Sequence, residues 1–191
     1  PRLLAGLRAR GLQDRVDLVV VSDHGMDAVP PSHVEWLDPR VPQDAYEVVG
    51  TMVIGVVPRP GREADVAPLL GRHAHHACYA KDAMPARWHY GTHARVPPIV
   101  CVPDPGWYLF AREPQRRAAG VRGEHGFDNA DPAMRAVFVA HGPSFREGVT
   151  LPAFDNVDVY PLLARLLGIT PAPNDGSVAP LLPALRETPT P

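Results

Sequence analysis

Two patterns in this 191-residue sequence predict an α/β protein with a mostly parallel sheet flanked by helices. Short apolar runs rich in β-branched residues, such as 16–22 (VDLVVVS) and 136–140 (AVFVA), are typical of strands buried on both faces of a parallel sheet. Segments with helical periodicity lie between and after such runs. Buried strands that alternate with helices favour an α/β domain.

The clearest helix is expected at 159–167, where apolar residues recur at the spacing of one helix face. Asp158 is expected to cap its amino terminus, and Gly168 is expected to end it. Further elements are expected along the chain: strands at 51–57, 99–102 and 107–110, and helices at 2–10 and 64–73.

Composition excludes several classes of function. Hydrophobic residues make up 45% of the chain and charged residues 21%, as in ordinary globular domains. The net charge is −2, and Lys81 is the single lysine among 19 scattered basic residues, so polymeric nucleic acid is not favoured as a partner. No apolar run approaches the roughly 20 residues of a membrane span. The richness in arginine, alanine and proline suggests a bacterium with a GC-rich genome.

Cysteine and histidine usage leaves alternatives open. Cys78 and Cys101 can form one bridge or none, and neither has a metal-binding spacing. His73, His75 and His76 are closely spaced, and we interpret them as surface histidines near a helix end rather than as metal ligands.

Two short segments combine residues that bind metals. Asp23 and His24 directly follow the run 16–22, where a carboxylate and an imidazole can turn toward one cation at the end of a strand. His125 lies between glycines in GEHGFDN, shortly before the run 136–140. Taken alone, an ordinary loop or turn is a more common explanation for each segment than a metal site.

Five blocks, taken together and in order, resemble the nucleotide pyrophosphatase/phosphodiesterases of the alkaline phosphatase superfamily. The blocks are LVVVSDHGM, MPARWHY, GEHGFDN, MRAVFVAHGPSF and NVDVYPLLARLLGI, and the similarity spans 14–176. One departure is Phe127, where the family has tyrosine, and this change leaves His125 untouched. The resemblance places residues 1–176 in the carboxyl-terminal half of an alkaline phosphatase-like catalytic domain and leaves 177–191 as a proline-rich tail.

The resemblance implies a site with two Zn²⁺ ions about 4 Å apart, which clamp the attacking and leaving oxygens at phosphorus. Asp23 and His24 match ligands of the zinc that activates the nucleophile. His125 matches a ligand of the other zinc. Direct coordination suits this chemistry because the local positive charge lowers the pKa of an attacking hydroxyl.

The family's nucleophile is a threonine that precedes the SDHG block, so the resemblance places no catalytic nucleophile in this chain. Thr51, Thr92 and Thr150 all follow that block and lie in other contexts. Either the amino-terminal half of the same catalytic domain is a separate chain or segment, or this chain is a fragment. We expect the former, and we expect the chain alone to be inactive. The complete protein is expected to be a monomer that is periplasmic or secreted.

The implied reaction is hydrolysis of phosphodiester or pyrophosphate bonds in nucleotides, which gives nucleoside 5′-monophosphates. Three alternatives stay open. The substrate can be a phospholipid-type phosphodiester, or the enzyme can be a phosphomonoesterase or sulfatase of the same superfamily. The chain can also be a non-catalytic binding domain that has kept the fold.

Overall fold

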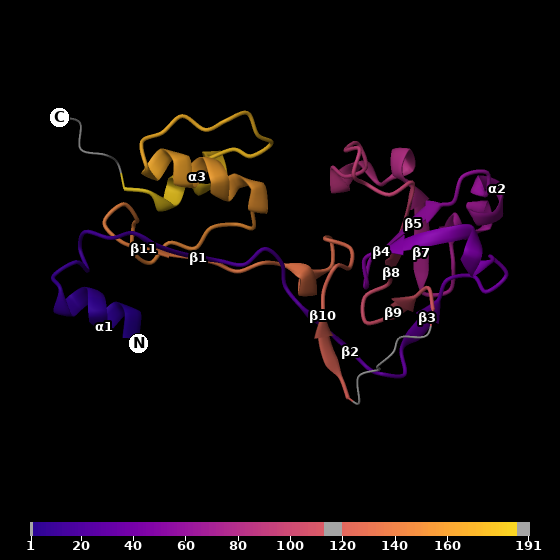
Figure 1. Cartoon of the computed structure of the whole chain (residues 1–191). Helices are drawn as coiled ribbons and strands as arrows, with labels where there is room; N and C mark the ends of the chain where they lie inside the picture. Colours follow the sequence, from indigo (N-terminus) through magenta and orange to yellow (C-terminus); the bar gives the residue numbers. More distant parts are fainter. Residues whose placement is uncertain (1, 113–119, 187–191) are drawn as a thin grey trace. The chain divides into compact units, whose positions relative to one another are not determined.

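The computed structural model describes residues 2–112 and 120–186, which form two compact units (Figure 1). Unit 1 contains the described residues of Pro1–Asp23 and Ala136–Pro191, and unit 2 those of His24–Arg135. Both predicted metal-binding histidines belong to unit 2, whereas Asp23 is the last residue of the first segment of unit 1.

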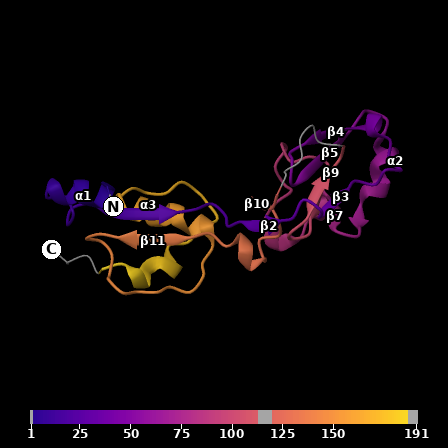
Figure 2. The same ribbon diagram turned by 90° about the horizontal axis from the view of Figure 1, so that it is seen from below.

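Unit 1 is built on a two-stranded antiparallel ribbon of β1 (Leu18–Val21) and β11 (Phe138–His141). Helix α3 (Val159–Leu166) lies over one face of this ribbon, as both views show (Figures 1 and 2). Its apolar face is buried through Val159, Leu162 and Ala164. The other elements of this unit are α1 (Arg2–Ala9), η6 (Asn156–Asp158) and η7 (Ala179–Ala184).

The prediction for the end of α3 is confirmed, whereas the prediction for its start is wrong. Gly168 follows the helix with φ of +67°, so the predicted glycine stop is confirmed. The predicted side-chain cap at Asp158 is wrong, because this residue already has helical backbone angles at the end of η6. Its buried carboxylate instead accepts a 2.7 Å hydrogen bond from the backbone N–H of Ser177. Of the tail expected at 177–191, residues 187–191 lie outside the described residues.

The strands of unit 1 are not buried on both faces, which corrects the interpretation of 16–22 and 136–140. Val20 is 60% exposed and Val139, its partner in the ladder, is 56% exposed. The sequence run identifies the strands correctly. Apolar content alone, however, does not show whether a second layer covers each face.

Unit 2 contains a five-stranded sheet in the order β4-β5-β8-β7-β6. A two-stranded ladder joins β2 and β10, and another joins β3 and β9. Its strands are β2 (Asp27–Val29), β3 (Val34–Trp36), β4 (Tyr46–Val49), β5 (Ile54–Pro58), β6 (Gly71–Arg72), β7 (His76–Ala80), β8 (Ile99–Pro103), β9 (Tyr108–Phe110) and β10 (Arg122–Glu124). Its helical turns are η1 (Gln43–Ala45), α2 (Glu63–Val66), η2 (Ala67–Leu69), η3 (Lys81–Ala83), η4 (Ala86–Trp88) and η5 (Pro132–Met134).

The expectation of a mostly parallel sheet is wrong. Within the described residues, β3–β9 is the one parallel pair, and every other ladder is antiparallel. Short connections explain this, since residues 50–53 join β4 to β5 and residues 73–75 join β6 to β7. A parallel pair needs a crossover of roughly a dozen residues or more.

The helix expected at 64–73 is much shorter in the structure. It consists of α2 and the 3₁₀ turn η2, and Pro68 lies at the start of that turn. The chain then enters a β-hairpin, in which the N–H of His73 donates to the carbonyl of His76 over 2.9 Å. The histidines therefore belong to a hairpin, not to a helix end.

A disulfide between Cys78 and Cys101 decides between the alternatives left open by the sequence. The two cysteines are opposite each other on β7 and β8, within the main core of unit 2. Leu37, Leu69 and Leu109 belong to the same core cluster. No helix of the described residues has the length and apolar character needed to span a bilayer.

Loss of the disulfide is expected to lower the free energy of unfolding by about 3 kcal/mol, because the bridge closes a loop with a sequence separation of 23. Urea unfolding of oxidised protein and of dithiol-reduced protein, with a chelator present, measures the difference. The double substitution Cys78→Ser/Cys101→Ser serves as the control and should no longer respond to reductant. A reductant response that persists in this variant would contradict the prediction.

Candidate metal centre

His24 and His125 lie face to face in unit 2. Their ring centroids are 3.7 Å apart and the ring planes differ by 12°. The structure thus brings together two of the three predicted ligands, which come from motifs far apart in the sequence. Asp23, the third, immediately precedes His24 in the chain and ends the first segment of unit 1.

The ladder of β2 and β10 determines this contact. Asp27 pairs with Glu124 at the end of the ladder. His24 precedes β2 and His125 follows β10, so antiparallel pairing carries both histidines past the same end of the ladder. Local backbone pairing therefore brings the two imidazoles together.

Gly25 lets the backbone after His24 pass close to the segment around η5. Its N–H donates to the carbonyl of Met134 over 2.9 Å, and the next N–H donates to the carbonyl of Ala133 over 2.8 Å. A Cβ at Gly25 would lie 2.0 Å from the Ala133 oxygen, so a larger residue does not fit. Gly126, next to His125, has φ of +98°, a conformation that favours glycine.

The His24 ring is oriented by its own loop. Nδ1 lies 2.7 Å from the carbonyl oxygen of Gly25. In the neutral imidazole this nitrogen donates its N–H, which leaves the lone pair on Nε2. Metal-binding histidines commonly donate their second N–H to a carbonyl in this way, so the arrangement fits a metal ligand.

Backbone contacts hold the Asp23 segment inside unit 1. Ser22 accepts at its Oγ from the N–H of Val137 over 2.9 Å. The Asn156 side chain donates to the carbonyl of Asp23 over 3.2 Å. The NVDVY block therefore supports the SDHG block, a connection that the sequence alone did not reveal.

An ion pair connects the MPARWHY block to the loop after His125. Arg87 donates from Nη1 to Asp128 over 2.6 Å and to the side chain of Asn129 over 2.9 Å, and its Nη2 also contacts Asp128. The hydrogen bond from Arg87 holds the pKa of Asp128 at about 2. The sequence analysis missed Arg87, whose signal was its place in a motif of the family resemblance.

Phe127 anchors the same loop by burial. It is 6% exposed and belongs to a second core cluster with Val29, Tyr108 and Met134. An apolar ring suits these surroundings, because a buried hydroxyl would need a hydrogen-bond partner. This explains how the loop accommodates phenylalanine where the family has tyrosine.

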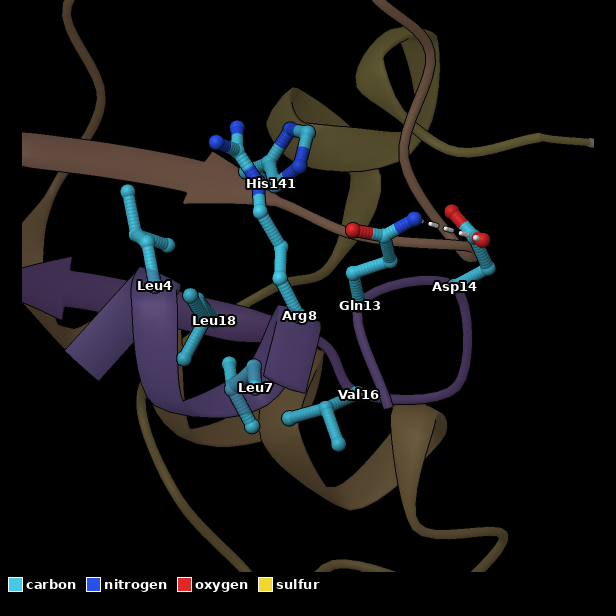
Figure 3. Close-up of a pocket in the computed structure, with 8 residues that line it drawn as sticks. All are labelled: Leu4, Leu7, Arg8, Gln13, Asp14, Val16, Leu18 and His141. Carbon is cyan, nitrogen blue, oxygen red and sulfur yellow. Dashed lines mark hydrogen bonds between the residues drawn. The ribbon is translucent and has the colours of Figure 1, made fainter. Parts of the chain in front are cut away.

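Two pockets of the described residues can be compared with this centre. The pocket in Figure 3 belongs to unit 1, and neither metal-binding histidine lines it. Its residues are Leu4, Leu7, Arg8, Gln13, Asp14, Val16, Leu18 and His141. A pocket of about 400 Å³ in unit 2 adjoins His125, since Gly126, Phe127 and Asn129 line it together with Trp88 and Tyr90. The second pocket is therefore the one next to the candidate centre.

The three hairpin histidines, His73, His75 and His76, were expected at the surface, and they differ in burial. His76 is buried, with 1% of the residue exposed, and its ring stacks on that of His73 at 4.3 Å. His75 stacks on Trp107 at 3.4 Å. The surface interpretation is wrong for His76 because a hairpin strand carries it into the core.

Comparison with known proteins identifies a family. The sequence model described as type I phosphodiesterase / nucleotide pyrophosphatase matches residues 1–128. Human ectonucleotide pyrophosphatase/phosphodiesterase family member 5 is 35% identical over 178 residues, which cover 92% of this chain and 36% of that protein. A bis(5′-adenosyl)-triphosphatase of Xenopus laevis is 32% identical, with 93% of this chain and 38% of that protein covered.

Solved structures agree with the sequence matches. Human family member 5 has a TM-score of 0.89 at 32% identity, with 97% of this chain and 50% of that chain covered. An inactive threonine-to-alanine variant of mouse family member 5, in complex with AMP, has a TM-score of 0.89 at 35% identity, with 97% and 49% covered. The chain thus spans under two fifths of these curated relatives and about half of the solved chains.

Gly25→Ala is expected to destabilise unit 2 by about 1 to 3 kcal/mol, because the added methyl group meets the Ala133 carbonyl. Chemical denaturation followed by tryptophan fluorescence measures the loss. Gly120→Ala is the matched control, since a Cβ there meets nothing within 4 Å. Equal stability of the two variants would show that the close approach at Gly25 is not needed.

Arg87→Met is expected to raise the pKa of Asp128 from about 2 toward 3.8, because the carboxylate loses its main hydrogen-bond donor. The ion pair stabilises the protein above about pH 4, and this contribution is lost as the pH falls toward 2. Asp128 is 33% exposed, so the loss is under about 1 kcal/mol. Carboxyl-carbon NMR titration tests the shift, and an unchanged pKa would contradict it.

Proposed function

Because the chain belongs to the type I phosphodiesterase/nucleotide pyrophosphatase family, we propose that it forms part of a zinc-dependent hydrolase of nucleotides. The reaction is cleavage of phosphodiester or pyrophosphate bonds with release of nucleoside 5′-monophosphates. The main observation in support of this proposal is the face-to-face contact of His24 and His125, whose ring centroids are 3.7 Å apart. The two histidines belong to two different motifs of the family resemblance. The AMP complex of the mouse relative supports a nucleoside monophosphate as the product.

The proposed ligands of two Zn²⁺ ions are Asp23, His24 and His125. Carboxylate and imidazole donors suit zinc, and the contact of His24 Nδ1 with the Gly25 carbonyl orients the ring as in metal-binding histidines. When bound, such ions supply positive charge that lowers the pKa of a coordinated hydroxyl and stabilises charge at phosphorus. Protons compete with metal for imidazole nitrogen, so activity should decline in acid.

The attacking hydroxyl is proposed to come from outside this chain, from the amino-terminal part of the same catalytic domain. The threonine-to-alanine change that accompanies inactivity in the mouse relative supports a threonine nucleophile. In this proposal residues 1–176 supply the carboxyl-terminal part of that domain, and the chain alone is inactive.

The uncovered face of the β1–β11 ribbon is the proposed contact for the amino-terminal part. Val20 and Val139 pair across the ladder, and each is more than half exposed. Two-stranded ribbons are marginally stable on their own, and burial of paired valines is favourable. A partner layer of the same domain would therefore stabilise unit 1.

The proposed location is the periplasm or the extracellular space of a bacterium, where the complete enzyme acts as a monomer. The human relative is named as an ectoenzyme. The Cys78–Cys101 disulfide supports the same conclusion, because such bonds persist in oxidising compartments.

In the complete protein, His125→Ala is expected to lower hydrolysis of a nitrophenyl phosphodiester by at least about 100-fold, because even loss of a residue that only hydrogen-bonds to a metal ligand costs about 10 to 100-fold. His75→Ala is the matched control and should change little, since His75 stacks on Trp107 at the hairpin. Steady-state rates with added Zn²⁺ measure both, and metal analysis should show less zinc in His125→Ala. Equal rates for the two variants would refute the assignment.

The same assay distinguishes the alternatives. The phosphodiester should be hydrolysed faster than the corresponding monoester or sulfate, and a nucleotide faster than a choline phosphodiester. The chain without its amino-terminal partner should hydrolyse none of them. A complete protein that lacks zinc and activity after gentle purification would instead identify a binding domain.

A further inference from the structure

A second group of metal-binding side chains lies in the hairpin of unit 2, apart from His24 and His125 in the sequence. His73, His76 and Cys78 each offer one ligand atom, and these atoms lie within 4.8 Å of one another. Among the described residues, this is the group of three or more His, Cys, Asp or Glu that meets that distance. Two imidazoles and one sulfur are a typical donor set for zinc-type ions.

The strand period and the hairpin explain why these residues meet. His76 and Cys78 are two residues apart on β7, so both point to the same face of the sheet. The hairpin places His73 against His76, with the rings stacked at 4.3 Å and nearly parallel at 2°. All three positions are fixed by backbone pairing.

The His76 imidazole is buried without a hydrogen-bond partner. The residue is 1% exposed, and neither Nδ1 nor Nε2 makes a hydrogen bond. Such orphaned polar atoms carry a free-energy cost, which a bound ion would remove.

One nitrogen of each ring lies near an acceptor of the protein. Nε2 of His73 lies 2.7 Å from the carbonyl oxygen of Leu69. Nδ1 of His76 lies 3.5 Å from the carboxylate of Glu35. Metal-binding histidines use carbonyl and carboxylate acceptors of this kind to orient the ring. The nitrogens left for an ion are then Nδ1 of His73 and Nε2 of His76.

We propose that His73, His76 and Cys78 form a binding site for a zinc-type divalent cation that opens when the Cys78–Cys101 disulfide is reduced. With the bridge intact, the sulfur of Cys78 is bonded to Cys101 and cannot act as a thiolate. A dithiol reductant gives two electrons and two protons to the bridge and becomes a disulfide, and two protein thiols result. Binding then displaces the thiol proton of Cys78 to solvent.

The site would connect the redox state of the core to metal supply. An ion held by the Cys78 thiolate opposes re-formation of the bridge, because the two reactions compete for one sulfur. The ion also stabilises the reduced fold, which has lost its cross-link. The proposed cation site does not depend on the proposed hydrolase activity. Its thiolate ligand gives a spectroscopic signal that a centre of carboxylate and imidazole ligands cannot give.

Cobalt(II) titration of the full chain tests the site, because a thiolate ligand gives a sulfur-to-cobalt charge-transfer band. Protein reduced with dithiothreitol and freed of reductant without oxygen should show the band, and Zn²⁺ should abolish it. Oxidised protein should not show it. Cys101→Ser, which frees the Cys78 sulfur, should show the band with no reductant.

Matched variants assign the ligands. Reduced Cys78→Ser should lose the band, the band of reduced His76→Gln should require at least tenfold more Co²⁺, and reduced His24→Ala should keep the wild-type band. Zn²⁺ should slow the air oxidation of reduced protein, followed by thiol titration. Circular dichroism checks folding, and if Cys101→Ser does not fold, the reduced wild type decides. A folded, reduced protein without the band, or a band that survives in Cys78→Ser, would overturn the proposal.

Discussion

Antiparallel pairing of β2 with β10 is the constraint on which the candidate centre depends. The register that sets Asp27 opposite Glu124 leaves His24 and His125 at the same end of the ladder. The two histidines are far apart in the sequence, so contacts between sequence neighbours alone could not bring them together. The chemistry attributed to the SDHG and GEHGFDN motifs is therefore a consequence of backbone hydrogen bonds, which hold both imidazoles within one unit.

Each side of this ladder has its own support, and the supports differ in physical kind. The His24 side depends on close backbone approach, which only glycine at position 25 allows. The His125 side combines burial of Phe127 with the ion pair of Arg87 and Asp128. Steric fit, apolar burial and charge thus act on one site. Loss of the contacts on one side of the ladder should therefore leave the histidine on the other side in place.

The sequence predicted the elements of the fold better than their arrangement. The leucine period at 159–167 corresponds to α3, and Gly168 ends the helix as expected. The predicted strand direction was wrong because apolar runs identify strands without giving their direction, whereas the short connections between strands determine direction. The pairing of Arg87 with Asp128 joins segments that are distant in the chain, so no local pattern could predict it.

The two histidine pairs show why identical side chains need not share a role. His24 donates to its own loop and contacts His125 beside Gly25 and Gly126, at a site proposed for catalytic ions. His76 is instead held inside a sheet, with no hydrogen bond to either ring nitrogen and a disulfide sulfur nearby. From sequence spacing alone, we interpreted His73, His75 and His76 as ordinary surface histidines. The burial of His76 contradicts that interpretation. A buried imidazole without a hydrogen bond raises the free energy of the folded state unless a ligand binds it.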